Sequence, residues 1–187
     1  MTDEPNSIDL KLWLDQDIIP RQNRLKAKFW NILSEVGNTV ELGSLSTIHE
    51  KSRGIKLSKG NDLLGYPYQV LDLIRDFNPE DGLNIRLLNW FGHGLFIFVL
   101  IGKNHPKAPL THLNRDSWLY DLAETQWDYP EILLNNAARE TPTENDFKNS
   151  VYYQWHKEIK INSSSDIKAR ILGELKNLSH ILIEKMG

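Results

Sequence analysis

The sequence predicts an α+β fold, in which an antiparallel sheet of about four to five strands packs in two layers against long helices near the N- and C-termini. Two observations lead to this prediction. Apolar residues recur at helical spacing near both ends of the chain, and alternating or continuous apolar runs lie between them. The 187 residues fit one globular domain, residues 1–187, because no internal repeat or low-complexity block divides them.

Both long helices are predicted from the spacing of apolar residues. The apolar-rich segment 8–19 is expected to form a first helix or an extended arm. Pro20 favours the start of the next helix, Gly37 offers its end, and the apolar residues between them share one face: Leu25, Phe29, Ile32, Leu33 and Val36. Near the C-terminus Ser163 begins a Ser-x-x-Asp capping box. The apolar positions of the helix after it are Ile167, Ile171, Leu175, Leu178 and Leu182.

The centre of the chain predicts three strands, over residues 66–73, 83–91 and 95–101. Gly92 and His93 separate the last two strands and fit a two-residue type II′ turn. That turn would place Arg86 opposite Val99. The run "LFIFVLI" at 95–101 has no polar alternation, so we expect a central strand covered at least in part on both faces.

The remaining segments carry weaker signals. Residues 38–64 are expected to form a loop with a short strand at 39–42, and residues 117–125 a short helix. Residues 126–149 are expected to be largely irregular. The segment 151–161 alternates apolar and polar residues, which predicts a strand with one buried and one solvated face.

Composition narrows the function classes. With 22 basic and 25 acidic residues the net charge is -3, which does not favour nucleic-acid binding. The absence of cysteine excludes disulfides and thiolate chemistry, and no glycine-rich nucleotide motif suggests a cofactor. The N-terminus at 1–5 does not resemble a signal peptide, and the run 95–101 is too short to cross a bilayer. We therefore expect a cytoplasmic protein that does not enter the membrane.

Three motifs favour structural explanations. His105, His112 and Asp116 are metal-ligand types, but their spacing fits neither a helical face nor a known metal clip, so no metal site is predicted. Ser165 and Lys168 match Ser-x-x-Lys at a helix start, where a capping role is favoured. The basic loop from Lys51 to Lys59 could hold an anion, but ordinary surface loops have similar composition, and its role stays open.

Aromatic and charged residues on the predicted strands supply the candidate site. Six tryptophans suit a core edge, a ligand pocket or a protein interface. Asp72 and Arg86 are charges within apolar strands and are expected to pair. His156 shares a strand face with Glu158, whereas His93 lies in a turn, where a structural or solvent-facing role is favoured. The candidate ligand-binding residues are Tyr68, Asp72, Arg86, Trp90, His93, Trp155 and His156.

Two functions remain open at this level. The first is a non-enzymatic binding or interaction module with an aromatic-rich surface or pocket, whose partners would be a second copy of the chain and a small-molecule ligand. The second is a small cofactor-independent acid-base enzyme. In that enzyme His156 or His93 would act as the base, oriented by Asp72 or Glu158. The sequence names no substrate for either one.

Overall fold

The computed structural model describes residues 7–41 and 48–184. Residues 1–5, which bear on the signal-peptide prediction, and Leu42, the end of the predicted strand at 39–42, lie outside these ranges. Within them no helix is both long enough and apolar enough to cross a membrane.

The fold is α+β, with a seven-stranded antiparallel sheet in the described part of the chain. The strands are β1 (Lys56–Leu63), β2 (Tyr66–Arg75), β3 (Leu83–Trp90), β4 (Gly94–Gly102), β5 (Leu119–Asp121), β6 (Ala138–Arg139) and β7 (Tyr152–Glu158). Their order across the sheet is β1-β2-β3-β4-β7-β5-β6. The predicted four to five strands are too few, because β1, β5 and β6 come from segments whose polar residues predict loop or helix.

Five α-helices accompany the sheet in the described ranges. They are α1 (Leu10–Trp13), α2 (Ile18–Glu41), α3 (Tyr129–Leu134), α4 (Glu144–Asn149) and α5 (Ile167–Glu184). The long helices α2 and α5 fall near the chain ends, as the apolar spacing predicts. However, α2 does not end at Gly37. A side chain there would meet Ile55 and Leu71 at 3.4 Å, so the glycine lets the helix approach the sheet closely.

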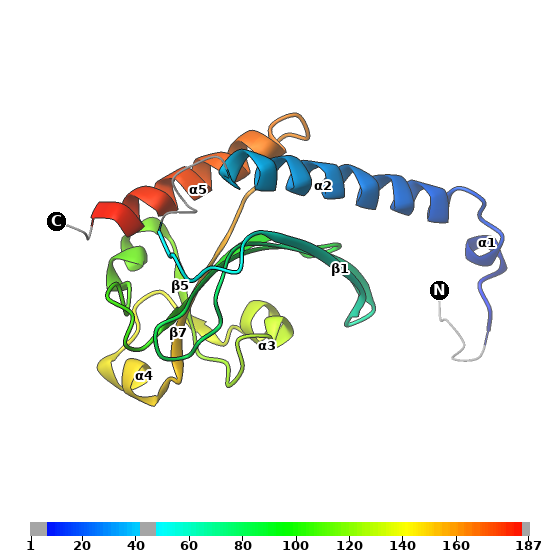
Figure 1. Cartoon of the computed structure of the whole chain (residues 1–187). Coiled ribbons are helices and arrows are strands. Elements are labelled where there is room, and N and C mark those ends of the chain that lie inside the picture. The colour runs from blue at the N-terminus through cyan, green and yellow to red at the C-terminus, as the bar shows by residue number, and fades with distance from the viewer. Residues whose placement is uncertain (1–6, 42–47, 185–187) are drawn as a thin grey trace.

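The two long helices lie side by side over one face of the sheet (Figure 1). We call this the helix face, and the opposite one the far face. The main core fills the space below the helices with side chains such as Leu33, Leu71, Ile97, Trp155 and Leu178. A smaller core on the far face packs against α3 and consists of Val70, Leu88, Trp90, Phe96, Phe98, Tyr129 and Ile132. The predicted two-layer packing therefore describes the helix side only.

Strand β4 is central and buried along 95–101, which confirms the prediction for "LFIFVLI". The predicted register is wrong by one residue. Trp90 pairs with Gly94, so the hairpin loop has three residues, and Arg86 lies opposite Phe98 rather than Val99. A one-residue shift moves every side chain of one strand to the other face relative to its neighbour. Arg86 and Phe98 therefore share the far face.

Three further predictions are wrong in detail. Residues 111–116 form a 3-10 helix and β5 follows, where a helix at 117–125 is predicted. The predicted strand at 39–42 falls largely within α2. Helix α5 begins at Ile167, three residues later than a capping box at Ser163 requires. For α2 the reason is packing, because Val40 is buried in the main core and extends the helix past the predicted strand.

A β-bulge in β2 changes which side chains reach the far face. The pairing of β2 with β3 shifts between Asp72 and Ile74, and both Leu73 and Ile74 join the main core. Strict alternation would then point Arg75 to the helix face. Because the bulge adds one residue, Arg75 pairs with Asn84 and lies on the far face with Asp72.

Candidate functional site

A row of side chains crosses the far face of the sheet from β1 to β7. Directly paired residues of antiparallel strands point to the same face. The register pairs the following residues in succession: Lys56, Asp72, Arg86, Phe98 and His156. Three of the predicted ligand-binding residues, Asp72, Arg86 and His156, therefore belong to one row.

Arg86 and Asp72 form a buried bidentate ion pair, as expected from their positions in apolar strands. Arg86 Nε lies 2.7 Å from Asp72 Oδ1, and Nη2 lies 3.0 Å from Oδ2. The Asn84 amide donates a further bond to Oδ1 at 3.1 Å. Burial lowers the pKa of the Arg86 guanidinium, but the bonds to Asp72 and Tyr129 outweigh it and hold that pKa above its ordinary value.

Aromatic side chains cover the guanidinium of Arg86. Its centre lies 4.5 Å from the centroid of the Trp127 ring and 5.7 Å from that of Phe77. Nη1 donates to the hydroxyl of Tyr129 at 2.6 Å. These contacts engage all three nitrogens of Arg86 and fix the plane of its guanidinium, so the group forms a rigid floor.

A cavity of about 500 Å³ opens above this floor, and we call it the basic pocket. Its lining residues are Arg53, Lys56, Ser58, Asp72, Arg75, Phe77, Arg86 and Trp127. Asp72 is the one carboxylate in this lining, and Arg86 already neutralises it. No ion pair is recorded for Arg53, Lys56 or Arg75 among the described residues. The pocket therefore carries an excess of positive charge beside the exposed ring of Trp127 and the partly buried ring of Phe77.

The other end of the row holds a buried histidine-carboxylate pair. His156 Nδ1 contacts Asp121 Oδ1, and Gln154 donates to Asp121 Oδ2 at 2.7 Å. Asp121 thus takes the orienting role that the sequence predicts for Glu158. Burial raises the pKa of the Asp121 carboxyl, and the hydrogen bonds from His156 and Gln154 oppose that rise. The predicted solvated face of β7 is wrong here, since Gln154 and His156 are both buried.

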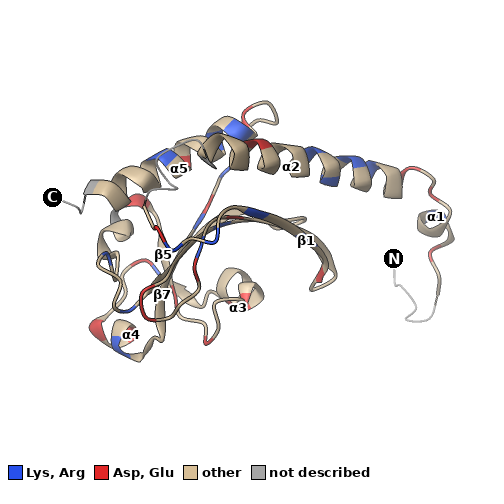
Figure 2. Ribbon diagram, in the orientation of Figure 1, with Lys and Arg blue, Asp and Glu red and all other residues tan. Residues whose placement is uncertain are grey.

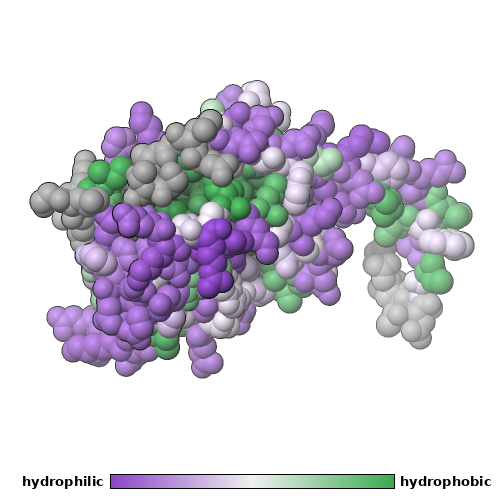
Figure 3. Space-filling model, in the orientation of Figure 1, coloured by the Kyte–Doolittle hydropathy of each residue, from purple (hydrophilic) through white to green (hydrophobic). Residues whose placement is uncertain are grey.

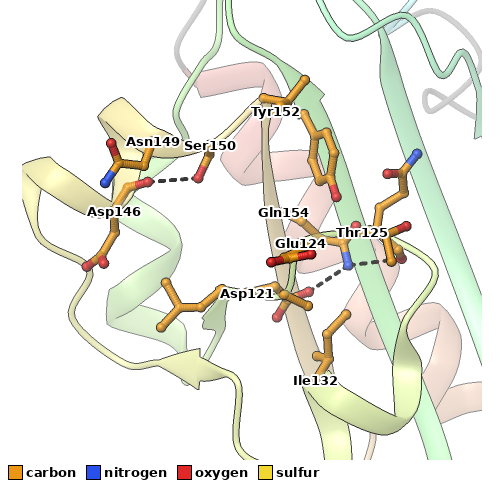
Figure 4. Close-up of a pocket in the computed structure, with 13 residues that line it drawn as sticks. Asp121, Glu124, Thr125, Ile132, Asp146, Asn149, Ser150, Tyr152 and Gln154 are labelled. Atoms are coloured by element: carbon orange, nitrogen blue, oxygen red, sulfur yellow. Dashed lines mark hydrogen bonds between the residues drawn. The ribbon is translucent and has the colours of Figure 1, made fainter.

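This pair lies between two further cavities. Figure 4 shows the first, of about 320 Å³, with Asp121, Tyr152 and Gln154 on one wall. The second, of about 660 Å³, includes His156 among its lining residues. Asp121 engages Nδ1 of the imidazole, which leaves Nε2 as the nitrogen for a substrate. The arrangement can therefore accept or donate one proton at His156.

The remaining predicted site residues lie elsewhere. Trp155 is on the helix face, fully buried, with Nε1 bonded to the carbonyl of Pro109 at 2.9 Å. Trp90 is fully buried on the far face beneath His93, whose ring centroid lies 3.9 Å away. Tyr68 packs over Gly60, where an added Cβ would meet its ring at 2.3 Å. The structure thus brings Asp72, Arg86 and His156 into one row and sets the four aromatic and turn residues apart from it.

Sequence reasoning missed several side chains of the site. Trp127 and Tyr129 come from a segment expected to be irregular, and Asp121 from one expected to be helical. Arg75 reaches the pocket only through the bulge in β2. A buried Arg-Asp pair must be shielded from water by neighbouring side chains. Trp127 and Tyr129 are large aromatic residues close together in the sequence, and this was the available signal for them.

A second polar cluster joins the loops before β1 and after β4. His49 Nε2 lies 2.8 Å from Asp76 Oδ2, and the rings of His49 and His105 lie 5.6 Å apart. Burial, with His49 and Lys107 nearby, lowers the pKa of His105 to about 4. No group of three or more His, Asp or Glu side chains in the described ranges is placed to hold a metal ion.

We expect this cluster to make stability depend on pH. An unfolded histidine titrates near 6.5, whereas folded His105 titrates near 4, so between these values the unfolded state binds more protons. Stability should be complete above pH 6.5 and fall on acidification towards pH 4, by at most about 1.4 kcal/mol per pH unit. Thermal unfolding from pH 7 to 4.5 measures this. The variant His105→Gln should show a shallower decline, and an unchanged slope would contradict the assignment.

Comparison with known proteins gives no match. No family model matches the chain, and no curated protein or solved structure is significantly similar to it. The function is therefore argued from the geometry of the far face.

Proposed function

We propose that the protein is a non-enzymatic binding module whose basic pocket takes a small anionic ligand with a planar group. The observation that carries this proposal is the unbalanced charge of the pocket. The single carboxylate in its lining, Asp72, is paired with Arg86. Among the described residues, Arg53, Lys56 and Arg75 form no ion pair with an acidic side chain. An anionic ligand would supply the missing charge. A cytoplasmic location is part of this proposal.

The aromatic side chains indicate the shape of the ligand. Trp127 is exposed and lies over Arg86, and its ring contacts Phe77 at 5.3 Å between centroids. Binding sites commonly combine apolar rings, which take up the body of a ligand, with a few polar groups that fix its orientation. Such a site favours an aromatic carboxylate or phosphate over a simple inorganic anion.

Calorimetric titration tests the proposal with matched probes. Benzoate and phenyl phosphate should bind, whereas benzamide, which keeps the ring and lacks the charge, should not. Lys56→Gln should weaken binding of the anions about tenfold or more, because a charge-assisted hydrogen bond contributes roughly 1.5 to 3 kcal/mol. Trp127→Leu should weaken the aromatic probes more than it weakens inorganic phosphate.

The control variant is Lys160→Gln, which removes a lysine from the lining of another cavity. It should leave the affinities unchanged. Higher ionic strength should weaken binding to the wild type, since the pocket is open to solvent. Equal affinity for benzoate and benzamide, or no effect of Lys56→Gln, would contradict the proposal.

A second candidate function is an acid-base enzyme, and the contact between His156 and Asp121 favours it. In this function His156 Nε2 would accept a proton from a substrate in the adjoining cavity. Asp121 would accept the hydrogen bond of the Nδ1 proton and stabilise the imidazolium formed. The proton would return from Nε2 to the product, so no cofactor takes part.

The tautomer of His156 tests this second candidate. Long-range proton-nitrogen NMR spectra should show neutral His156 protonated at Nδ1, with Nε2 free. In the variant Asp121→Asn that preference should weaken. A proton found on Nε2 in the wild-type protein would remove the proposed base, and the enzyme candidate with it.

A further inference from the structure

The N-terminal part of the chain projects away from the sheet as an arm, which we define as residues 7–28. Figure 1 shows α2 running past the end of the sheet, with α1 turned below its N-terminal end. Every residue from 7 to 25 is exposed. Local bonds nevertheless order the arm, because Asp9 caps α1 and Asp15 accepts from the backbone of Asp17 and Ile18 at the start of α2.

The arm is strongly apolar for a segment with this exposure. Of the fifteen large hydrophobic residues exposed in the described ranges, eight lie within it: Ile8, Leu10, Leu12, Trp13, Leu14, Ile18, Ile19 and Leu25. Trp13 is 71% exposed and Leu10 60%. Figure 3 shows these side chains gathered around α1 and the adjoining end of α2. A concentration of this kind marks an interaction surface.

The exposed surface continues a buried one along the same helix. Ile18, Leu25 and Ile32 recur every seven residues along one side of α2 and form a stripe with Phe29. Its C-terminal half packs on the sheet through Ile32 and Val36, whereas Ile18 and Leu25 lie beyond the sheet and remain uncovered. The stripe therefore needs a second covering element outside this copy of the fold.

The charges of the arm indicate which element covers the exposed stripe of α2. Residues 7–17 carry three carboxylates against one lysine, a net charge of -2, whereas residues 18–28 carry four basic residues and no acid, a net charge of +4. In Figure 2 the Lys and Arg positions, coloured blue, recur along the projecting part of α2. In an antiparallel pair of arms, the acidic part of each faces the basic part of the other. The arm is thus complementary in charge to its own copy.

We propose that the arm is the interface of a homodimer, in which each copy packs α1 against the projecting part of α2 of the other. The interface is isologous, since the same residues contribute from both sides of a two-fold axis. The apolar side chains of α1 and of the stripe at Ile18 and Leu25 form its centre, and the opposite charges fix the antiparallel direction. This proposal does not depend on the ligand of the basic pocket.

Light scattering coupled to size-exclusion chromatography tests the dimer on the full chain. The wild type should have twice the 21.7 kDa mass of one chain at micromolar concentration. The double variant Leu10→Glu with Trp13→Glu should raise the dimer dissociation constant at least about a hundredfold. Val151→Glu is the matched control, because Val151 is 65% exposed outside the arm. It should leave the dimer intact, and the circular dichroism spectra of all three proteins should show the same helix and strand content.

Charge reversal distinguishes a second copy from any other partner. One variant carries Arg21→Glu, Arg24→Glu and Lys28→Glu, and the other carries Gln16→Lys and Asp17→Lys, which reverse the charge of residues 7–17 and keep the Asp9 and Asp15 caps. Each should be monomeric alone, and an equimolar mixture should form a mixed dimer. Since the chain has no cysteine, a single cysteine at Gln16, between the acidic and basic parts and so near the two-fold axis, should also cross-link the wild-type dimer, whereas Lys160→Cys should not.

Two results would overturn the proposal. One is a wild-type protein that stays monomeric at high concentration, which would mean that the arm serves another partner. The other is a dimer that survives both the apolar and the charge variants, which would place the interface elsewhere. Neither result bears on ligand affinity at the basic pocket, so the two proposals fail separately.

Discussion

Replacing Arg86 with methionine is expected to lower the free energy of unfolding by about 3 to 5 kcal/mol. Methionine keeps an unbranched apolar stem but removes the guanidinium, which leaves the carboxylate of Asp72 without its cation. That carboxylate is 3% exposed and retains only the amide of Asn84 as a side-chain partner. The cost therefore comes mainly from a buried, uncompensated charge. Chemical denaturation of the two proteins measures it.

Two controls separate this cost from loss of packing. The double variant Asp72→Leu with Arg86→Met removes both charges and should recover most of the lost stability, because an apolar pair of similar volume replaces an ion pair at little cost. Arg139→Met removes a pair with Asp146 in which the arginine is half exposed, and should cost less than about 1 kcal/mol. If Arg86→Met proves as mild as Arg139→Met, the buried pair is not a structural anchor.

Trp155→Ala is expected to cost about 3 to 5 kcal/mol, the usual range for deleting a large buried aromatic side chain. Trp155 is fully buried between the sheet and the helices, and its ring packs edge-on against Tyr120 at 5.0 Å between centroids. The substitution also removes the Nε1 donor, so the carbonyl of Pro109 loses its hydrogen bond from Trp155. Equilibrium unfolding followed by circular dichroism measures the change.

Trp127→Leu is the matched control, because it removes the same side chain from an exposed position. It should cost roughly 1 to 2 kcal/mol, less than Trp155→Ala, because the half-exposed ring loses its contact with the Arg86 guanidinium but leaves no cavity in the main core. It should also weaken binding of aromatic anions in the basic pocket. The opposite pattern, with a stable Trp155→Ala and an unstable Trp127→Leu, would reverse the core and pocket assignments of the two tryptophans.

Apolar periodicity was sufficient to predict the elements that form the main core. The C-terminal half of α2, the helix α5 and the strands β2, β3, β4 and β7 each contribute an apolar face to the main core, so their patterns persist over many residues. The strand β1 contains Lys56, Lys59 and Asp62 and lies at the sheet edge, where no apolar pattern is required. The short strands β5 and β6 are defined by their pairing with β7 and with each other rather than by their own residues.

The site was less predictable because it depends on register. The pairing of Asp72 with Arg86 follows from two charges in apolar strands, and it could be predicted. Arg86 and His156 share a row because the hairpin loop between β3 and β4 has three residues. The sequence predicts a two-residue loop there, at Gly92 and His93. The partner of His156 lies 35 residues earlier in the chain, so no local pattern reveals it. The length of the hairpin loop fixes the register of the strands, and tertiary contacts fix the partner of His156. The alternation of apolar and polar residues predicts neither.

The edge strand β1 has a consequence for how copies of this protein can associate. An exposed edge offers unpaired backbone groups to a neighbouring strand, which is a common route to aggregation. Here Lys56 and Lys59 flank that edge, and the pairing with β2 is irregular between Gly60 and Leu63. Charges and irregular pairing both disfavour the addition of a strand from another molecule. Strands of a second copy should therefore not add to the sheet at its β1 edge, even in concentrated solutions.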